Sequence, residues 1–174
     1  MESKESKETQ PSAPQATGCC PPFDPALWPD RELTWEHKPF VKDHVLSVLH
    51  VPLNMGRRVQ RNQKLIRAAG AEAPVPLMLT DEHSLWGAEI YIDVTKPVPG
   101  AEMTELSGTF LTKVYEGPFK DAGKWAEEMR RYASGMGRPV EKIYFAYTTC
   151  PACAKVYGKN YVILFAKVAT PPTN

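Results

Sequence analysis

Two acids and a phenol recur at every second position within residues 88–94: Glu89, Tyr91 and Asp93. Successive side chains of a β-strand point to opposite faces, so we expect these three to share one face. The other face, which we assign to the helix-packed core, carries Ala88, Ile90, Ile92 and Val94. If this polar face is simply exposed to solvent, the two acids need no functional explanation. If it lines a cleft instead, burial raises the pKa of Glu89 and suits it to general acid–base catalysis, with Tyr91 as hydrogen-bond donor to the leaving or developing anionic oxygen. An ionised Glu89 would attract a cationic or polarised ligand.

Aromatic residues close to this strand are candidates for the walls of such a cleft. Trp86 lies just upstream of the strand, and Tyr115, Tyr144 and Tyr147 lie in other predicted strands. Tyr144 and Tyr147 are three positions apart, so at most one of them can face the cleft. Ordinary core packing is the alternative role for each ring. We take the four aromatic residues, together with Asp93, as the predicted ligand-binding set.

The cysteines form a second candidate group. Cys150 and Cys153 have the spacing of a zinc knuckle or of a thiol redox pair, and the other pair is the adjacent Cys19 and Cys20. Adjacent thiolates fit one metal tetrahedron poorly, so a histidine is an alternative ligand. The histidines are His37, His44, His50 and His83. A redox motif should open a helix after a strand, whereas we expect C-P-A-C in a turn. Inert side chains in a turn are the third alternative. We expect no required cofactor, and a structural zinc ion is the candidate addition.

Composition excludes several classes of function. The chain has 174 residues, 43% of them hydrophobic and 24% charged, as in a soluble domain or two fused half-domains. A net charge of +1 gives no field for nucleic acid, and no apolar run is long enough for a membrane span. The polar N-terminus is not a secretion signal, so we expect a cytoplasmic protein. Phosphate-loop, dinucleotide and nucleophile-elbow motifs do not occur in the sequence.

The first part of the chain has little regular structure in this interpretation. Residues 1–18 are almost entirely polar, which predicts a disordered tail. Residues 19–39 are rich in proline and aromatic residues, and the prolines disfavour a helix or a central strand. We expect an extended segment that Phe23, Trp28 and Trp35 hold against the core.

The remainder, residues 40–168, contains the same order of elements twice. The first half, about 40–96, has a predicted strand (41–51), a helix (52–69, ended by Gly70) and two strands (77–79 and 88–94). The second half, about 105–168, has a strand (108–115), a helix (119–133) and two strands (142–148 and 161–168). The pattern predicts an α+β fold of duplicated β-α-β-β units, with helices on one sheet face and a ligand cleft between the halves.

The segment FLTKVYEGPFKDAGKWAEEMRRY, residues 110–132, resembles the second half of GyrI-like (gyrase-inhibitor-like) small-molecule-binding domains. The resemblance covers about residues 40–168 and implies an SHS2-like tandem. The whole chain also looks like a bacterial group labelled hydrolase. The matching segments are GCCPPFDP, SLWGAEIYIDV and TTCPACAKVYGKNYVI.

Two activities are implied by this resemblance. Some relatives bind hydrophobic, often cationic drugs through an acidic residue, whose position best matches Glu89, with Trp86 and Tyr91 as neighbours. Others, the cyclopropanoid cyclopropyl hydrolases, open a strained ring with water. We therefore expect a small-molecule hydrolase that acts on hydrophobic, electrophilic or toxic compounds. The alternatives are a binder that sequesters such ligands or inhibits gyrase, and a zinc-stabilised interaction module. Oligomeric state cannot be derived from the sequence.

Overall fold

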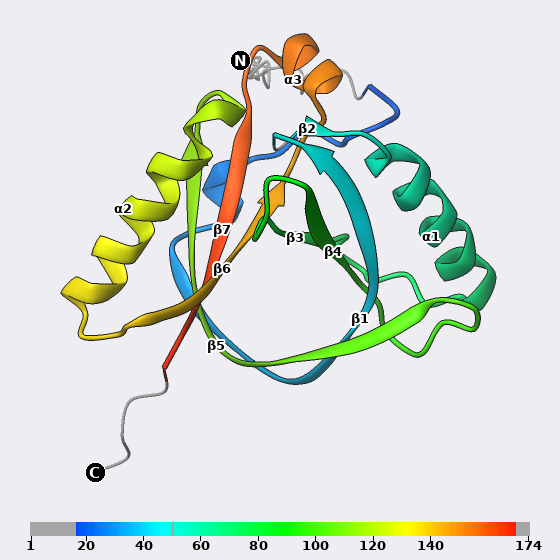
Figure 1. The fold of residues 1–174 in the computed structure, drawn as a ribbon, viewed down its shortest axis with the longest axis horizontal. Coiled ribbons are helices and arrows are strands. Elements are labelled where there is room, and N and C mark those ends of the chain that lie inside the picture. Colours follow the sequence, from blue (N-terminus) through cyan, green and yellow to red (C-terminus); the bar gives the residue numbers. More distant parts are fainter. Residues whose placement is uncertain (1–16, 50, 170–174) are drawn as a thin grey trace, which may run out of the picture.

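The computed structural model describes residues 17–49 and 51–169, which form one curved sheet with helices outside it (Figure 1). The strands are β1 (Arg31–Val48), β2 (Val51–Pro52), β3 (Met78–Asp81), β4 (Gly87–Asp93), β5 (Glu102–Glu116), β6 (Val140–Tyr147) and β7 (Tyr161–Val168). The helices are α1 (Met55–Ala69), α2 (Ala122–Gly135) and α3 (Pro151–Tyr157), with single 3-10 turns η1 (Pro25–Leu27) and η2 (Phe119–Asp121).

The sheet closes on itself like a barrel. Its strand order is β2-β1-β4-β3-β6-β7-β5, and β5 pairs again with β1, every pairing being antiparallel. The order β1-α1-β3-β4 followed by β5-α2-β6-β7 confirms the duplicated β-α-β-β fold. The additions to it are the short β2 and the helix α3 between β6 and β7. Because β1 pairs with both β4 and β5, it belongs to both halves of the ring.

Both long helices cover the outer face of the sheet (Figure 1). Ile66 of α1 packs with Val41 and Val94, and α2 buries Trp125 and Met129 against β5, β6 and β7. The helix α1 begins at Met55, three residues later than predicted, because Pro52 pairs with Ser47 in β2. It ends where predicted, at a left-handed Gly70, which accepts positive φ without strain.

The strand β1 begins at Arg31, so the expectation that residues 31–39 lie outside the sheet is wrong. A bulge between Trp35 and Lys38, with His37 at a φ of 50°, lets the strand bend and keep pairing with β5. The other prolines of this region precede the strand, and Pro39 follows the bulge. Proline content therefore masked a strand whose Leu33 and Trp35 face inward.

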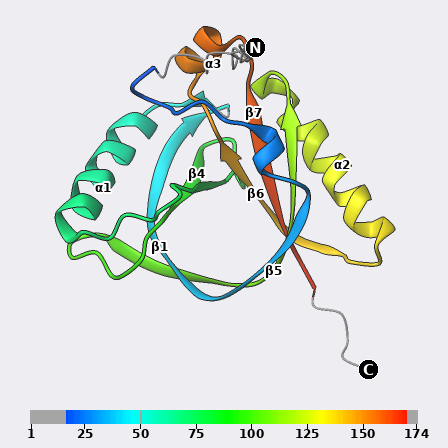
Figure 2. The ribbon, with the colours of Figure 1, turned by 180° about the vertical axis from the view of Figure 1, so that it is seen from behind.

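The inner face of the ring is filled with aromatic side chains in place of an empty cleft. Trp35, itself half-buried, packs against three of these rings, with ring-centroid distances of 4.5 Å to Phe110, 5.6 Å to Phe40 and 5.7 Å to Phe165. The N-terminal segment adds Trp28, 5.9 Å from Phe165. Figure 2 shows this segment, in blue, crossing the back of the molecule from near α3 to β1. As predicted, the aromatic residues of this segment pack on the core.

A polar contact attaches α1 to β1 and gives a first stability prediction. The buried Asn62 side chain donates to Asp43 Oδ2 at 2.8 Å. Asn62→Ala leaves that carboxylate oxygen without its donor, so we expect the free energy of unfolding to fall by about 1–3 kcal/mol. Chemical denaturation measures this loss, and the exposed neighbour Gln63 supplies the control, Gln63→Ala. An equal effect of both substitutions would contradict the assigned contact.

Candidate functional site

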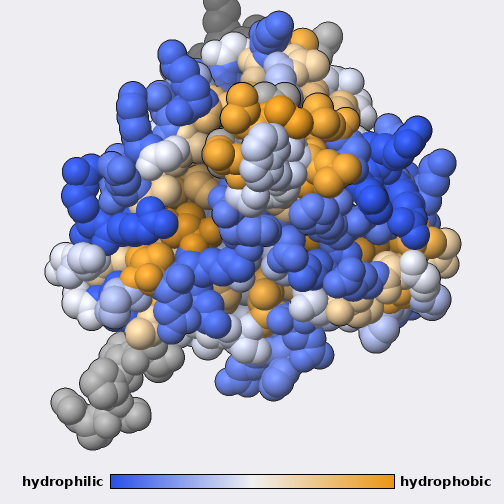
Figure 3. All heavy atoms as spheres, in the orientation of Figure 1, coloured by the Kyte–Doolittle hydropathy of each residue, from blue (hydrophilic) through white to orange (hydrophobic). Residues whose placement is uncertain are grey.

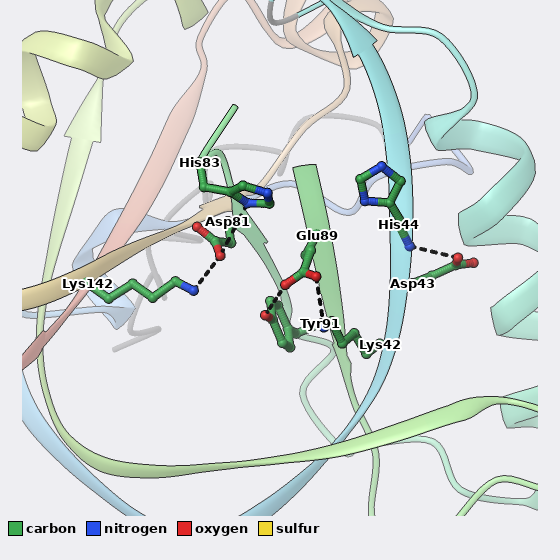
Figure 4. A network of polar contacts seen from close by, with 8 residues as sticks. All are labelled: Lys42, Asp43, His44, Asp81, His83, Glu89, Tyr91 and Lys142. Carbon is green, nitrogen blue, oxygen red and sulfur yellow. Dashed lines mark hydrogen bonds and ion pairs between the residues drawn. The ribbon is translucent and has the colours of Figure 1, made fainter. Parts of the chain in front are cut away.

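A row of inward-facing polar side chains crosses the strands β1, β4, β3 and β6 (Figure 4). Glu89 of β4 lies directly opposite His44 on β1 and Asp81 on β3. His44 lies against Gly87, where a Cβ would meet the imidazole at 2.6 Å, so the glycine makes room for the ring. The row therefore brings two carboxylates and a histidine together at one end of the ring.

Glu89 is an ion-paired carboxylate. Lys42 Nζ lies 2.8 Å from Oε1, and the Tyr91 hydroxyl donates to Oε2 at 2.8 Å. The Lys42 contact, which outweighs the cost of burial, lowers the pKa of Glu89 below its ordinary value. The expectation of a raised pKa for Glu89 is wrong, because Lys42 reaches the carboxylate from β1 through the pairing of β1 with β4. The side chain keeps 26% of its surface exposed, so a ligand can reach an ionised acid.

Tyr91 connects Glu89 to the aromatic core. Its ring meets that of Tyr144 edge-on, at 5.6 Å and 89°. Burial, reinforced by the Glu89 carboxylate, raises the pKa of Tyr91, so the phenol stays protonated and acts as a donor. Because it donates to Glu89 in this structure, Tyr91 orients the carboxylate.

Asp81 is the second acid of the row. Lys142 Nζ lies 2.5 Å from its Oδ2, and His83 Nδ1 lies 3.6 Å from the same oxygen. Burial disfavours the ammonium, yet the Asp81 contact holds the pKa of Lys142 above its ordinary value. The row thus holds two neighbouring acid–lysine pairs with opposite charges balanced within each.

Two predicted ligand-binding residues, Tyr115 and Tyr147, lie away from this row. Tyr115 is buried beneath α2, where its ring stacks on Trp125. Tyr147 packs on the α2 side of the sheet and donates to Glu82. The expectation that Tyr115 and Tyr147 line a cleft with Glu89 is therefore wrong, whereas the opposite facing of Tyr144 and Tyr147 is as predicted. Asp93 shares the face of Glu89 and Tyr91, as predicted, and pairs with Lys38 at 2.8 Å.

Trp86 and the open hollows show where the surface is accessible. Trp86 is 64% exposed, so it forms no closed wall beside Glu89. One hollow of about 490 Å³ is lined by Lys38, Val75 and Asp93, among others. A second, of about 500 Å³, lies between Gly117 and α3. Neither hollow is lined by Glu89, which is itself partly exposed.

The cysteine motif lies in a different setting from the one predicted. Cys150 caps the N-terminus of α3 and Pro151 is its first residue, so C-P-A-C opens a helix after the strand β6. The prediction that this motif lies in a turn is therefore wrong. The sulfurs of Cys19, Cys20, Cys150 and Cys153 come together in one cluster, and no histidine of the described residues joins it. His50 lies outside the described residues.

Several residues of the polar row were missed by sequence reasoning. Lys42, Asp81 and Lys142 come from three different strands, and only the pairing register brings them to Glu89. His44 and His83 were considered only as metal ligands. A weak signal existed, since Lys42 and His44 alternate with the apolar Val41 and Val45.

Comparisons with known proteins give a family for the chain and support its fold. A family model described as bacterial hydrolase matches residues 10–168. The chain is similar to the structure of a hydrolase from Listeria innocua, at 14% identity and a TM-score of 0.59, over 80% of this chain and 91% of that one. It is equally similar to an uncharacterized conserved protein from Listeria innocua, at 12% identity and a TM-score of 0.59, over 80% and 92%. These likenesses concern the fold alone.

The comparison with curated proteins gave no match. Within residues 17–49 and 51–169, every helix is too short or too polar to span a bilayer.

Proposed function

We propose that this chain, which belongs to the bacterial hydrolase family, hydrolyses small hydrophobic electrophiles at the rim of the ring, with Glu89 as the residue that holds the attacking water. The observation that carries this proposal is an ionised, partly exposed carboxylate fixed by two contacts, from Lys42 and Tyr91. A fixed carboxylate accepts a hydrogen bond from water and orients its oxygen toward a bound electrophile.

The charges of the row favour hydrolysis over capture of cationic ligands. A cation that approaches Glu89 meets a carboxylate already neutralised by Lys42, and Asp81 beyond it is neutralised by Lys142. Binding would have to displace an ammonium group at 2.8 Å, where the ion pair is strongest. A neutral electrophile has no such competitor.

The nature of the substrate follows from the surface beside the row. Exposed apolar side chains gather at the ends of β1 and β2 and before β4, and Figure 3 shows orange groups collected in the upper part of this face. They are Leu46, Val48, Leu49, Leu53, Leu85 and Trp86. Backbone bonds hold these segments together, from Leu53 to Leu46 and from Ser47 to Trp86. A patch of this kind is a binding surface for apolar molecules.

The strength of the base limits the reaction. A carboxylate whose pKa is lowered is a weak base, so the substrate must be reactive enough for attack by a weakly activated water. The water oxygen forms a bond to the electrophilic carbon, its proton passes to Glu89, and the leaving group departs with the bonding electrons and is then protonated by solvent. The Lys142 ammonium on β6, which pairs with Asp81 on the intervening strand β3, is the lysine of the row that is not bound to Glu89, and it is assigned to stabilise that developing anion.

The test of this proposal is a mass-spectrometric screen of electrophilic compounds, such as activated esters and strained rings, in water labelled with oxygen-18. A hydrolase yields products that carry the label in amounts that depend on Glu89. A binding protein returns every compound unchanged and would overturn the proposal, as would turnover that Glu89→Gln leaves intact.

The Lys42 contact also predicts a pH dependence. Activity requires ionised Glu89, so it is lost as pH falls through the lowered pKa of that carboxyl group. Lys42→Met removes the charge that lowers this pKa, and we expect the acid limb of the kcat/KM profile to move to higher pH. The control, Lys38→Met, removes a lysine of the same strand that pairs with Asp93. It should leave the limb in place, and a shift of equal size would contradict the assignment.

A further inference from the structure

The four cysteines of the chain converge at one point from two distant segments. Cys19 and Cys20 lie before the first strand, and Cys150 and Cys153 lie at the start of α3. Their sulfur atoms all lie within 4.8 Å of one another, and all four cysteines are free. Convergence of every cysteine in 174 residues is not expected of inert side chains in a turn.

We propose that Cys19, Cys20, Cys150 and Cys153 form a structural zinc site that attaches the N-terminal segment to α3. A tetrahedral tetrathiolate zinc site with Zn–S distances of about 2.3 Å places its sulfurs about 3.8 Å apart. Cys19 and Cys20 Sγ are 3.7 Å apart, which meets this spacing although the residues are adjacent in sequence. The objection that adjacent thiolates fit one tetrahedron poorly is therefore removed by the geometry.

The polar groups around the sulfurs are arranged as around metal-bound thiolates. The Cys150 backbone N–H donates to Cys20 Sγ at 3.3 Å. Thr17 Oγ1 lies 3.1 Å from Cys153 Sγ, where its single proton can be donated to a thiolate. The Tyr157 hydroxyl donates to the Cys20 carbonyl. Such outer contacts orient thiolate ligands, and here they hold residues 17–20 against α3.

The ligand set selects the metal. Four sulfurs and no oxygen or nitrogen ligand among the described residues of the cluster favour a soft tetrahedral ion, for which zinc is the commonest choice. With all four positions taken by protein, no position is open for water or substrate, which indicates a structural role. The C-x-x-C pair supplies one edge of the tetrahedron and the adjacent pair the opposite edge.

The consequence of the site lies in the segment that follows it. After Cys20 the chain places Phe23 at 5.6 Å from the Tyr161 ring and Trp28 at 5.9 Å from that of Phe165. A zinc ion would fix the start of this segment, so that its aromatic side chains stay on the sheet. The role is independent of Glu89, whose contacts come from β1 and β4.

The experiment is metal analysis of the full chain, purified under reducing conditions without an added metal. We expect about one zinc per chain, and less than about a tenth of that in Cys19→Ser/Cys20→Ser and in Cys150→Ser/Cys153→Ser. Two matched controls should keep the metal. Ala152→Ser adds a hydroxyl between the C-terminal ligands, and His37→Ala removes an exposed histidine outside the cluster.

Cobalt titration of the wild-type chain provides a measurement that does not depend on folding of a variant. A tetrathiolate site gives thiolate-to-cobalt charge-transfer bands and intense d–d bands, which zinc abolishes. Absence of both zinc and these bands would overturn the proposal. So would a mass lower by two or four hydrogens after purification without reductant, which would identify the cysteines as a disulfide-forming redox group. Retention of zinc by either double variant would place the metal elsewhere.

Discussion

Glu89→Gln is expected to lower kcat for an accepted electrophile by about a hundredfold to ten-thousandfold, the range that general acid–base groups contribute. Glutamine has the shape of glutamate and still accepts the Tyr91 hydrogen bond, but it cannot take a proton from water. KM should change little, because the apolar patch that binds the substrate is left intact. Steady-state kinetics with a compound from the labelled-water screen measures both constants.

The matched control for this substitution is Glu127→Gln. Glu127 lies on the exposed face of α2, outside the polar row, and its neutralisation should leave kcat within twofold. Both variants should unfold at similar denaturant concentrations, so that loss of fold is separated from loss of chemistry. Equal kcat values for Glu89→Gln and wild type would remove Glu89 from the mechanism.

Trp35→Ala is expected to lower the free energy of unfolding by about 3 kcal/mol or more, the scale of large aromatic truncations in packed cores. The Trp35 ring contacts Phe40, Phe110 and Phe165, which come from three strands of the closed sheet. Its removal takes away the contacts with all three of these rings at once. Urea denaturation, monitored by far-ultraviolet circular dichroism, measures the loss.

Trp86→Ala is the control for that effect, since it deletes the same side chain from an exposed position. Stability should change by no more than about 0.5 kcal/mol. If the Trp86 ring contacts the substrate, KM rises while stability is kept. A Trp35→Ala protein as stable as Trp86→Ala would show that the aromatic packing contributes little to the fold.

Local alternation was sufficient to predict the centre of the candidate site. The period of two in residues 88–94 placed Tyr91 toward Tyr144 and Ile92 toward the helix side, as the structure has them. The partners that set the pKa of Glu89 could not be predicted, because Lys42 reaches it from a strand whose register depends on the whole sheet. The sequence alone therefore predicts a stronger base at Glu89 than the structure contains, because it does not show that Lys42 lies beside the carboxylate.

The two errors of secondary structure have local causes. Proline content outweighed the alternation of Leu33 and Trp35, although a bulge before Pro39 lets the strand continue. For the cysteine motif, Pro151 at the first helical position is a signal for a helix start, which the short distance between two strands obscured. The meeting of Cys19 and Cys20 with α3 is a tertiary contact, which no local pattern contains.

The pairing of β1 with β5 determines when the ring can close during folding. The Thr112 side chain donates to the Arg31 carbonyl across 81 positions of sequence, and the ladder between these strands joins residues that are 60 to 81 positions apart. Such pairs lose chain entropy before they gain contacts, so the ring should be completed late and slowly, after each hairpin has formed. A fragment that contains only the first half would have to keep β1 folded without β5, the strand that closes the ring.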